Sequence, residues 1–167
     1  QFNLKIYKVT TKEKIFDTHA NYWKVSDNGK YLFNNDKIFE VKENEVTLLK
    51  DLGFGGKISN VDFSKDGNEL YYTVDETGVF EYNLAANSTR NLNIDGQIYL
   101  IEFDDYTNKI LVHKNLYNSN SQELSIYNKN GSELFTTTAN ASYKGLYTFL
   151  KDKLFSLKKG IVLENHF

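Results

Sequence analysis

Hydrophobic and polar residues alternate over short stretches of this chain, and polar turns separate these stretches. Residues 4–9, 37–41 and 78–83 carry apolar side chains at or near every second position. A period of two is typical of a β-strand with one buried face. Turns rich in Gly, Asn, Asp and Ser follow these runs, so we expect strands joined by hairpins. The best helix candidate, residues 83–89, lacks both the length and the 3.6-residue period of a stable helix.

A longer pattern returns four times. Each copy has an apolar residue, then a polar turn rich in Asp and Asn, then a hydrophobic strand. The copies begin at Val25, Phe63, Phe103 and Phe149, so their first residues are 38, 40 and 46 positions apart. A period near 40 residues that is built from strands is typical of a β-propeller with four-stranded blades.

The strands group into units of four. A first strand ends at the apolar residue, a second follows the turn, and the third and fourth form a hairpin. We expect three complete units at about 21–56, 57–96 and 97–140, partial units at 1–20 and 141–167, and one propeller-like repeat domain or propeller segment over residues 1–167. The predicted fold class is therefore all-β, with four-strand antiparallel blades.

The two partial units do not fit together simply. Residues 1–20 supply a third and a fourth strand, whereas residues 141–167 supply a first, a second and a third. Joining them would place the third strand twice in one blade. A closed ring of about four blades is therefore possible only with one third strand displaced. The simpler interpretation is a segment of a larger ring, with further chain at both ends. The absence of Met from a chain that starts at Gln1 agrees with a mature form or an excised part.

The chemistry of the Asp- and Asn-rich turns explains part of the repeated pattern. Asp-Gly and Asn-Gly supply residues that adopt a positive φ, as tight hairpins require. The residues two places before the repeated apolar position share its face of the strand. We expect all four to be core: Trp23, Val61, Ile101 and Tyr147.

Two of the turns carry a family resemblance. Segments 26–32 (SDNGKYL) and 63–71 (FSKDGNELY) resemble the F-S-x-D-G-x-x-L-Y core of WD40-like repeats of the TolB and YVTN type. The Gly-His and Trp-Asp pairs of true WD40 repeats are absent. The resemblance implies a propeller scaffold that often mediates protein contacts. It carries no catalytic residues to this chain.

Composition narrows the range of partners. The net charge of −2 gives no electrostatic reason to bind nucleic acid or an anionic membrane. Arg90 is the only arginine, although arginine is the preferred residue for bidentate contacts to phosphates and bases. No apolar run approaches the roughly 20 residues that span a bilayer. We expect a protein partner, no nucleic acid and no membrane insertion, together with self-association through exposed blade edges.

Candidate chemistry is sparse. Without Cys the chain has no disulfide, thiolate ligand or Cys nucleophile. His19, His113 and His166 lie far apart and lack metal-ligand spacing. The glycine-rich segment 51–59 (DLGFGGKIS) departs from a phosphate-binding loop, because Ile58 stands where Ser or Thr is needed. The acidic pairs at 75–76 and 104–105 are best explained as solvated turn residues. We expect no cofactor, no metal site and no catalytic residue.

These observations predict a binding module that is not an enzyme. The loops at 17–22, 51–57, 94–98 and 139–145 should gather on one face and meet a protein or another ligand. The candidate contact residues are His19, Tyr22, Phe54 and Tyr143, with Phe54 as an exposed tip between glycines. Two alternatives stay open: a propeller accessory to a hydrolase or glycan-active enzyme, and a structural subunit that completes a ring by self-assembly. An exported location (periplasmic or cell-surface) of a bacterial protein is favoured over a cytoplasmic one.

Overall fold

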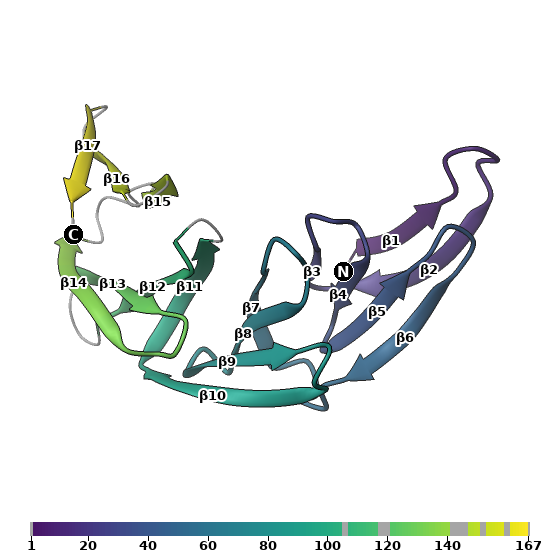
Figure 1. Cartoon of the computed structure of the whole chain (residues 1–167), viewed down its shortest axis with the longest axis horizontal. Coiled ribbons are helices and arrows are strands. Elements are labelled where there is room, and N and C mark those ends of the chain that lie inside the picture. Colours follow the sequence, from purple (N-terminus) through teal and green to yellow (C-terminus); the bar gives the residue numbers. More distant parts are fainter. Residues whose placement is uncertain are drawn as a thin grey trace.

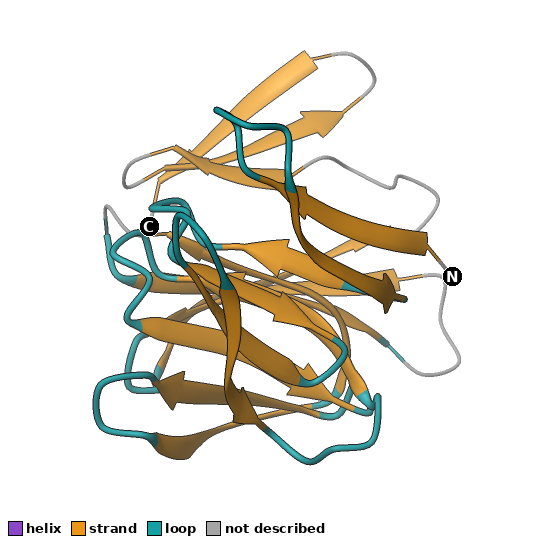
Figure 2. Cartoon of the chain, turned by 90° about the vertical axis from the view of Figure 1, so that its right-hand side faces the viewer, coloured by secondary structure: helices purple, strands orange, loops and turns teal. Residues whose placement is uncertain are grey.

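The protein is built from antiparallel β-strands. The computed structural model describes residues 2–104, 107–116, 121–140, 147–150, 153–158 and 161–166, and gives side chains as far as residue 138. Within these ranges the chain forms strands, turns and bends, and no helix. Figure 2 shows strands joined by short loops. The all-β fold class predicted from the alternating pattern is confirmed.

The strands form a hairpin and four larger sheets. The N-terminal hairpin pairs β1 (Phe2–Tyr7) with β2 (Lys14–Ala20). The first sheet contains β3 (Trp23–Val25), β4 (Tyr31–Asn34), β5 (Lys37–Val41) and β6 (Val46–Asp51). The second sheet contains β7 (Ile58–Phe63), β8 (Glu69–Val74), β9 (Gly78–Asn83) and β10 (Ser88–Asp95).

The remaining strands continue the same scheme. The third sheet contains β11 (Gln97–Asp104), β12 (Lys109–Asn115), β13 (Ser121–Asn128) and β14 (Glu133–Asn140). The C-terminal sheet contains β15 (Tyr147–Leu150), β16 (Lys153–Lys158) and β17 (Ile161–His166). In every sheet, strands that follow each other in the chain lie side by side. This order needs only hairpin connections, as the short polar turns predict.

The sheets follow one another around an open arc (Figure 1). The arc runs from the N-terminal hairpin through the second sheet to the C-terminal sheet, and the N and C labels lie far apart in this view. The first strand of each sheet pairs with the second in one repeated register. The pairs that show it are Lys24↔Phe33, Asp62↔Tyr71, Glu102↔Leu111 and Thr148↔Phe155.

The hydrophobic core lies between neighbouring sheets. One buried cluster joins Phe33 of β4 to Val61 and Phe63 of β7. The next cluster joins Tyr71 of β8 to Phe103 of β11, whose rings stack with centroids 4.4 Å apart. In both places the second strand of one sheet covers the first strand of the next. Burial of this apolar surface supplies the main stabilisation of the arc.

The prediction that Trp23 is core is wrong. Trp23 is 49% exposed and Val25 is 40% exposed, whereas Val61 and Phe103 at matching positions are 3% and 7% exposed. The element on the N-terminal side of the first sheet explains the difference. The N-terminal hairpin contains two strands, so it lacks the second strand that would cover β3. Ile101 is buried as predicted, and the side chain of Tyr147 lies outside the described residues.

The turn between β7 and β8 is closed by a compact hydrogen-bond network. The hydroxyl of Ser64 donates to the carboxylate of Asp66 (2.7 Å) and accepts from the backbone N–H of Glu69 (3.0 Å). Asp66 also accepts from the backbone N–H of Asn68 at 3.0 Å. Gly67 has a φ of 74°, the left-handed conformation that glycine adopts without strain. This network explains why Ser, Asp and Gly recur at these spacings.

The turn between β3 and β4 repeats the arrangement with an amide in place of the carboxylate. Asn28 accepts from the hydroxyl of Ser26 (2.8 Å) and from the backbone N–H of Lys30 (2.9 Å). Its amide nitrogen donates to the backbone carbonyl of Asp66 at 2.5 Å. The two turns are thereby joined, and a Cβ at Gly67 would lie 2.6 Å from the Asn28 amide. The turn motif therefore connects neighbouring sheets as well as neighbouring strands.

Replacing Asp66 tests this network. The hydrogen bonds from Asn68 and then Ser64 lower the pKa of Asp66 below its ordinary value near 3.8. Its contribution to stability is therefore full above that pH and lost as the pH falls further. Asp66→Asn should keep the fold, as Asn28 does, and flatten the acid end of the curve of unfolding free energy against pH. Asp66→Ala should lower the unfolding free energy at neutral pH by about 1 kcal/mol, because the acceptor is lost.

Urea titrations from neutral to acidic pH measure both effects. Asp27→Asn, at an exposed position in the neighbouring turn, is the matched control. Equal acid sensitivity of the wild type and Asp66→Asn would contradict the role given to Asp66.

Candidate functional site

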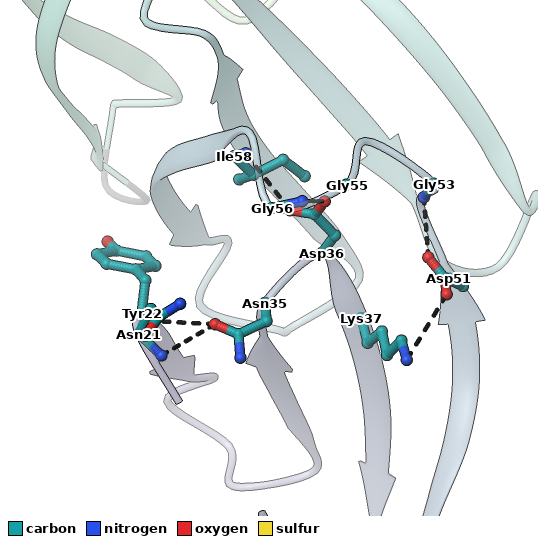
Figure 3. A pocket seen from close by; sticks show the side chains of 10 residues that line it. All are labelled: Asn21, Tyr22, Asn35, Asp36, Lys37, Asp51, Gly53, Gly55, Gly56 and Ile58. Atoms are coloured by element: carbon teal, nitrogen blue, oxygen red, sulfur yellow. Dashed lines mark hydrogen bonds and ion pairs between the residues drawn. The ribbon is translucent and has the colours of Figure 1, made fainter. Parts of the chain in front are cut away.

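A polar depression of about 500 Å³ lies at the junction of the N-terminal hairpin, the first sheet and the second sheet. Three short segments form it: the connection between β2 and β3, the hairpin tip between β4 and β5, and the connection between β6 and β7 (Figure 3). We call it the junction pocket. Its lining residues are Asn21, Tyr22, Asn35, Asp36, Lys37, Asp51, Gly53, Gly55, Gly56 and Ile58.

The hairpin tip between β4 and β5 is a two-residue turn with positive φ at both positions. Asn35 has a φ of 47° and Asp36 has a φ of 68°. Turns of this kind match the twist of the flanking strands, and Asn and Asp are among the residues that tolerate them. The turn brings one polar side chain to each side of the tip. Asn35 reaches toward the N-terminal hairpin, and Asp36 reaches toward the second sheet.

The carboxylate of Asp36 holds the connection between β6 and β7. Its two oxygens accept hydrogen bonds from the backbone N–H groups of Gly56 and Ile58, the latter at 3.4 Å. The backbone carbonyl of Asp36 accepts from the N–H of Leu52 at 2.9 Å. Asp36 is 3% exposed, so a carboxylate that is normally solvated is here satisfied by the backbone. It fixes the position of the glycine-rich connection.

The side chain of Asn35 holds the connection between β2 and β3 in the same way. Its oxygen accepts from the backbone N–H groups of Asn21 (3.0 Å) and Tyr22 (3.4 Å). Its nitrogen donates to the carbonyl of His19 at 3.0 Å. The hydroxyl of Tyr22 lies 3.3 Å from the backbone nitrogen of Val61 and can accept a hydrogen bond from it. The ring of Tyr22 packs edge-on against Phe33 with centroids 6.3 Å apart.

The glycine-rich connection is ordered by contacts on both of its sides. Gly53, Gly55 and Gly56 face the pocket with φ between 66° and 83°, a conformation that larger residues seldom adopt. Phe54 lies on the other side, where its ring centroid is 5.9 Å from that of Tyr72 and 6.2 Å from that of Phe80. The expectation that Phe54 is an exposed tip is wrong, because the ring is half-buried against the core between the first and second sheets.

The rim of the pocket carries one charge of each sign. Lys37 and Asp51 lie on neighbouring strands with the ammonium nitrogen 3.9 Å from a carboxylate oxygen. Asp51 also accepts from the backbone N–H of Gly53 at 2.9 Å. Both side chains are about half exposed, so the ion pair is screened by solvent and adds little stability. The charges remain accessible to a ligand.

The same scheme recurs at the next hairpin tip. The backbone N–H of Asp75 donates to the carbonyl of Lys57 (2.9 Å), and the carbonyl of Glu76 accepts from Ile98 (2.6 Å). Asp75 and Glu76, two of the three residues at this tip, have positive φ, as do Asn35 and Asp36 in the first sheet. Hairpin tips and inter-sheet connections therefore gather at one end of the sheets. The predicted clustering of the connections at 17–22, 51–57 and 94–98 is borne out for their described residues, although β2 extends to Ala20 and shortens the first.

The most perturbed titratable groups lie away from the pocket. Burial raises the pKa of Tyr71, and its hydrogen bond to Glu69 raises it further. Burial also lowers the pKa of His113 to about 4. Burial first, and then the neighbouring Asp62, raises the pKa of Glu102. Catalytic acids and bases usually show such shifts inside the cleft where they act, and of the described residues with shifted pKa none lines the junction pocket.

The described part of the chain also contains no three His, Asp or Glu side chains that gather as a metal site. It contains no helix that is long and apolar enough to cross a membrane.

The residues predicted to bind a partner are only partly brought together. Tyr22 lines the pocket, and His19 contributes its carbonyl to the adjacent hydrogen-bond network with its side chain exposed. Phe54 borders the pocket but packs inward. Tyr143 lies outside the described residues. The sequence analysis missed Asn35 and Asp36, although the Asn-Asp pair between two short strands was the available signal for a tight turn.

Comparison with solved structures identifies the fold. No family model and no curated protein matches the chain. The hydrazine synthase of Kuenenia stuttgartiensis is similar, with a TM-score of 0.66, 10% identity and coverage of 92% of this chain and 49% of that one. The β-propeller domain of the Trilobed protease from Pyrococcus furiosus is also similar, with a TM-score of 0.54, 12% identity and coverage of 78% and 41%. The fold is a β-propeller.

The matches cover most of this chain, but only about half of the length of each matched structure. A eukaryotic initiation factor matches with a TM-score of 0.62 and 15% identity, covering 97% of this chain and 47% of that one. The chain therefore spans about half the length of the structures that it matches. The structural similarity establishes the propeller fold, whose blades are the sheets described above. At sequence identities this low it says nothing of activity.

Substitution of Asp36 tests how the pocket is held. Asp36→Ala would leave the buried N–H groups of Gly56 and Ile58 without their acceptor, and we expect a loss of about 1–3 kcal/mol in unfolding free energy. Amide hydrogens of the 52–57 connection should exchange faster. Asp36→Asn keeps one acceptor oxygen, so its unfolding free energy and exchange rates should lie between those of the wild type and Asp36→Ala. Denaturant titration and hydrogen-exchange mass spectrometry measure these effects, and an unchanged exchange rate in Asp36→Ala would contradict the assignment.

His113 should make the blade core sensitive to acid. It lies in β12 between Leu100 and Leu124, is 6% exposed and stays neutral in the native state down to pH about 4. The unfolded chain binds the proton near pH 6.5. Stability should therefore fall as the pH drops from 6.5 toward 4, by up to about 3 kcal/mol. His113→Gln should remove this slope in urea titrations, and an unchanged slope would show that other groups cause it.

Proposed function

We propose that this propeller is a non-catalytic interaction module that binds a polypeptide partner at the junction pocket. The observation that carries the proposal is the construction of the pocket. The side chains of Asn35 and Asp36 at one hairpin tip fix the two neighbouring connections, so polar groups on the rim are held in place before a ligand arrives. Preorganised loops on a rigid sheet scaffold are the usual setting of binding sites.

The chemistry of the lining favours a polypeptide. The rim offers an ammonium group from Lys37, a carboxylate from Asp51 and the amide of Asn21, which is exposed. The glycine-rich connection presents backbone without side chains, so an extended segment can approach it closely. Mixed donors and acceptors of this kind suit peptide groups and side chains of either charge. Phosphate groups would favour a cluster of cations instead.

The family assignment belongs to the same proposal. We infer that the chain is a WD40-like propeller of the TolB and YVTN type. The support is the turn network of Ser64, Asp66 and Gly67, which gives the F-S-x-D-G pattern a structural reason. Repetition of that network at Ser26 and Asn28 adds to the support. Propellers of this group often mediate protein contacts, which agrees with a binding role.

A pair of charge reversals tests the binding surface. Partners would first be captured from extracts with the tagged protein and their affinity measured with purified components. Asp51→Lys changes the rim of the pocket and should weaken binding at least about tenfold, because it reverses a contact charge and breaks the pair with Lys37. Asp27→Lys makes the same change at an exposed turn outside the pocket and should leave affinity unchanged.

A photo-crosslinking amino acid at Asn21 gives an independent readout, since the partner should crosslink there and not from position 27. Equal affinity of the Asp51→Lys variant and the wild type, or crosslinking from position 27 alone, would overturn the assignment of the pocket.

A further inference from the structure

The wall of the junction pocket contains a negative charge with no cation paired to it. The carboxylate of Asp36 is 3% exposed, and its partners are the neutral N–H groups of Gly56 and Ile58. Within the part of the chain that the structure describes, Asp36 forms no ion pair. A buried charge is costly unless another group compensates it, so the charge of Asp36 calls for an explanation.

The next blade shows that the fold does not require this charge. Ile98 holds the place of Ile58 one blade later, and the pairing register of both strands shifts directly after these residues. The N–H of Ile98 donates to the main-chain carbonyl of Glu76 at 2.6 Å. A neutral carbonyl thus connects that hairpin tip to its connection, whereas a carboxylate does so at the first tip. The charge of Asp36 can act on the pocket that it lines.

The glycine-rich connection has its hydrogen-bond donors occupied and its acceptors free. The N–H groups of Gly53 and Gly56 donate to the carboxylates of Asp51 and Asp36. The main-chain carbonyls of Gly53, Gly55 and Gly56 accept no hydrogen bond from a described residue. The part of the pocket that these glycines line therefore offers oxygen atoms and few N–H groups. Such a surface suits a ligand that donates hydrogen bonds.

The charges of the lining residues favour a cationic ligand. The carboxylates of Asp36 and Asp51 outnumber the single ammonium group of Lys37, so the lining carries a net charge of −1 (−2 + 1). The ammonium nitrogen of Lys37 lies 3.9 Å from the Asp51 carboxylate, and both side chains are about half exposed. This contact is long and solvated, so a donor with better geometry can displace Lys37 from Asp51 (Figure 3).

Building on the proposed binding role of this pocket, we propose that it takes an arginine side chain of the partner polypeptide, whose guanidinium group donates to Asp51 and to the free carbonyls of the connection. Asp36 attracts the cation from within the wall, where its charge is weakly screened, without touching it. A guanidinium group carries several N–H donors in a planar fork, so it can serve a carboxylate and carbonyls together. A metal ion fits less well, because the described residues bring no three His, Asp or Glu side chains together.

Short peptides test this assignment on the purified chain. The probe is acetyl-Gly-Arg-Gly-amide, and its matched control carries citrulline, which has nearly the same shape and no charge, in place of arginine. Isothermal titration calorimetry measures the affinities, and the amide NMR signals of Gly53, Gly55 and Gly56 report where the peptide binds. The arginine peptide should bind at least about tenfold more tightly than the citrulline peptide and shift these signals. A peptide with glutamate in the same place should not bind.

Substitutions of the two rim charges should act in opposite directions. Asp51→Asn keeps an acceptor for the N–H of Gly53 and removes the rim carboxylate, so it should weaken binding of the arginine peptide about fivefold. Lys37→Gln removes the competing ammonium group and should strengthen binding about threefold. Asp75→Asn is the matched control, because Asp75 pairs with Lys57 at 3.0 Å beside the next hairpin tip and does not line the pocket. It should leave the affinity unchanged, and circular dichroism checks that all three variants remain folded.

Equal affinity for the arginine and citrulline peptides, tighter binding of the glutamate peptide, or no binding of any of the three overturns the proposed arginine site. So does an Asp51→Asn variant that binds the arginine peptide as the wild type does. The pocket would still be the binding surface if Asp51→Lys weakens binding of the captured partner, because it would then select another group. Failure of the binding role itself shows separately, as a captured partner whose affinity Asp51→Lys leaves unchanged.

Discussion

The packing of one blade's second strand on the first strand of the next is the contact on which the rest of this structure depends. Phe33 lies over Val61 and Phe63, and Tyr71 stacks on Phe103, so each blade buries the apolar face of its successor. Each sheet alone would expose both faces and both edges, which is unfavourable for so small a sheet. The order of the blades is therefore stabilised by a chain of similar interfaces, each depending on the blade before it.

Polar contacts follow the same seams and fix their geometry. Asp62 accepts from the backbone N–H of Phe103 (2.9 Å) and forms an ion pair with Lys24, so one carboxylate connects the first strands of three blades. At the ends of the sheets, Asn28 reaches the neighbouring turn and Asp36 holds the inter-blade connection. The junction pocket is formed by these contacts at the ends of the sheets. Its shape depends on the seam between the first and second blades being closed.

The sequence predicted local features well and non-local ones poorly. Strand order, blade period and the role of Ser64, Asp66 and Gly67 follow from alternation and turn chemistry, which act between residues close in the chain. Trp23 was misplaced because its burial depends on a strand that its own repeat unit does not contain. Phe54 was misplaced because flanking glycines indicate a mobile turn, whereas its burial depends on Tyr72 and Phe80. The pocket escaped prediction because three connections meet there only after the blades have packed.

Hydrogen-exchange mass spectrometry on the monomeric chain tests the central claim most directly, because it compares first strands that a preceding blade covers with one that no blade covers. The strands β3, β7 and β11 are all first strands at the edge of their sheets. If packing by the preceding blade stabilises them, amides of β7 and β11 will be strongly protected and those of β3 will exchange much faster. Equal protection of β3, β7 and β11 in the monomer would contradict the account.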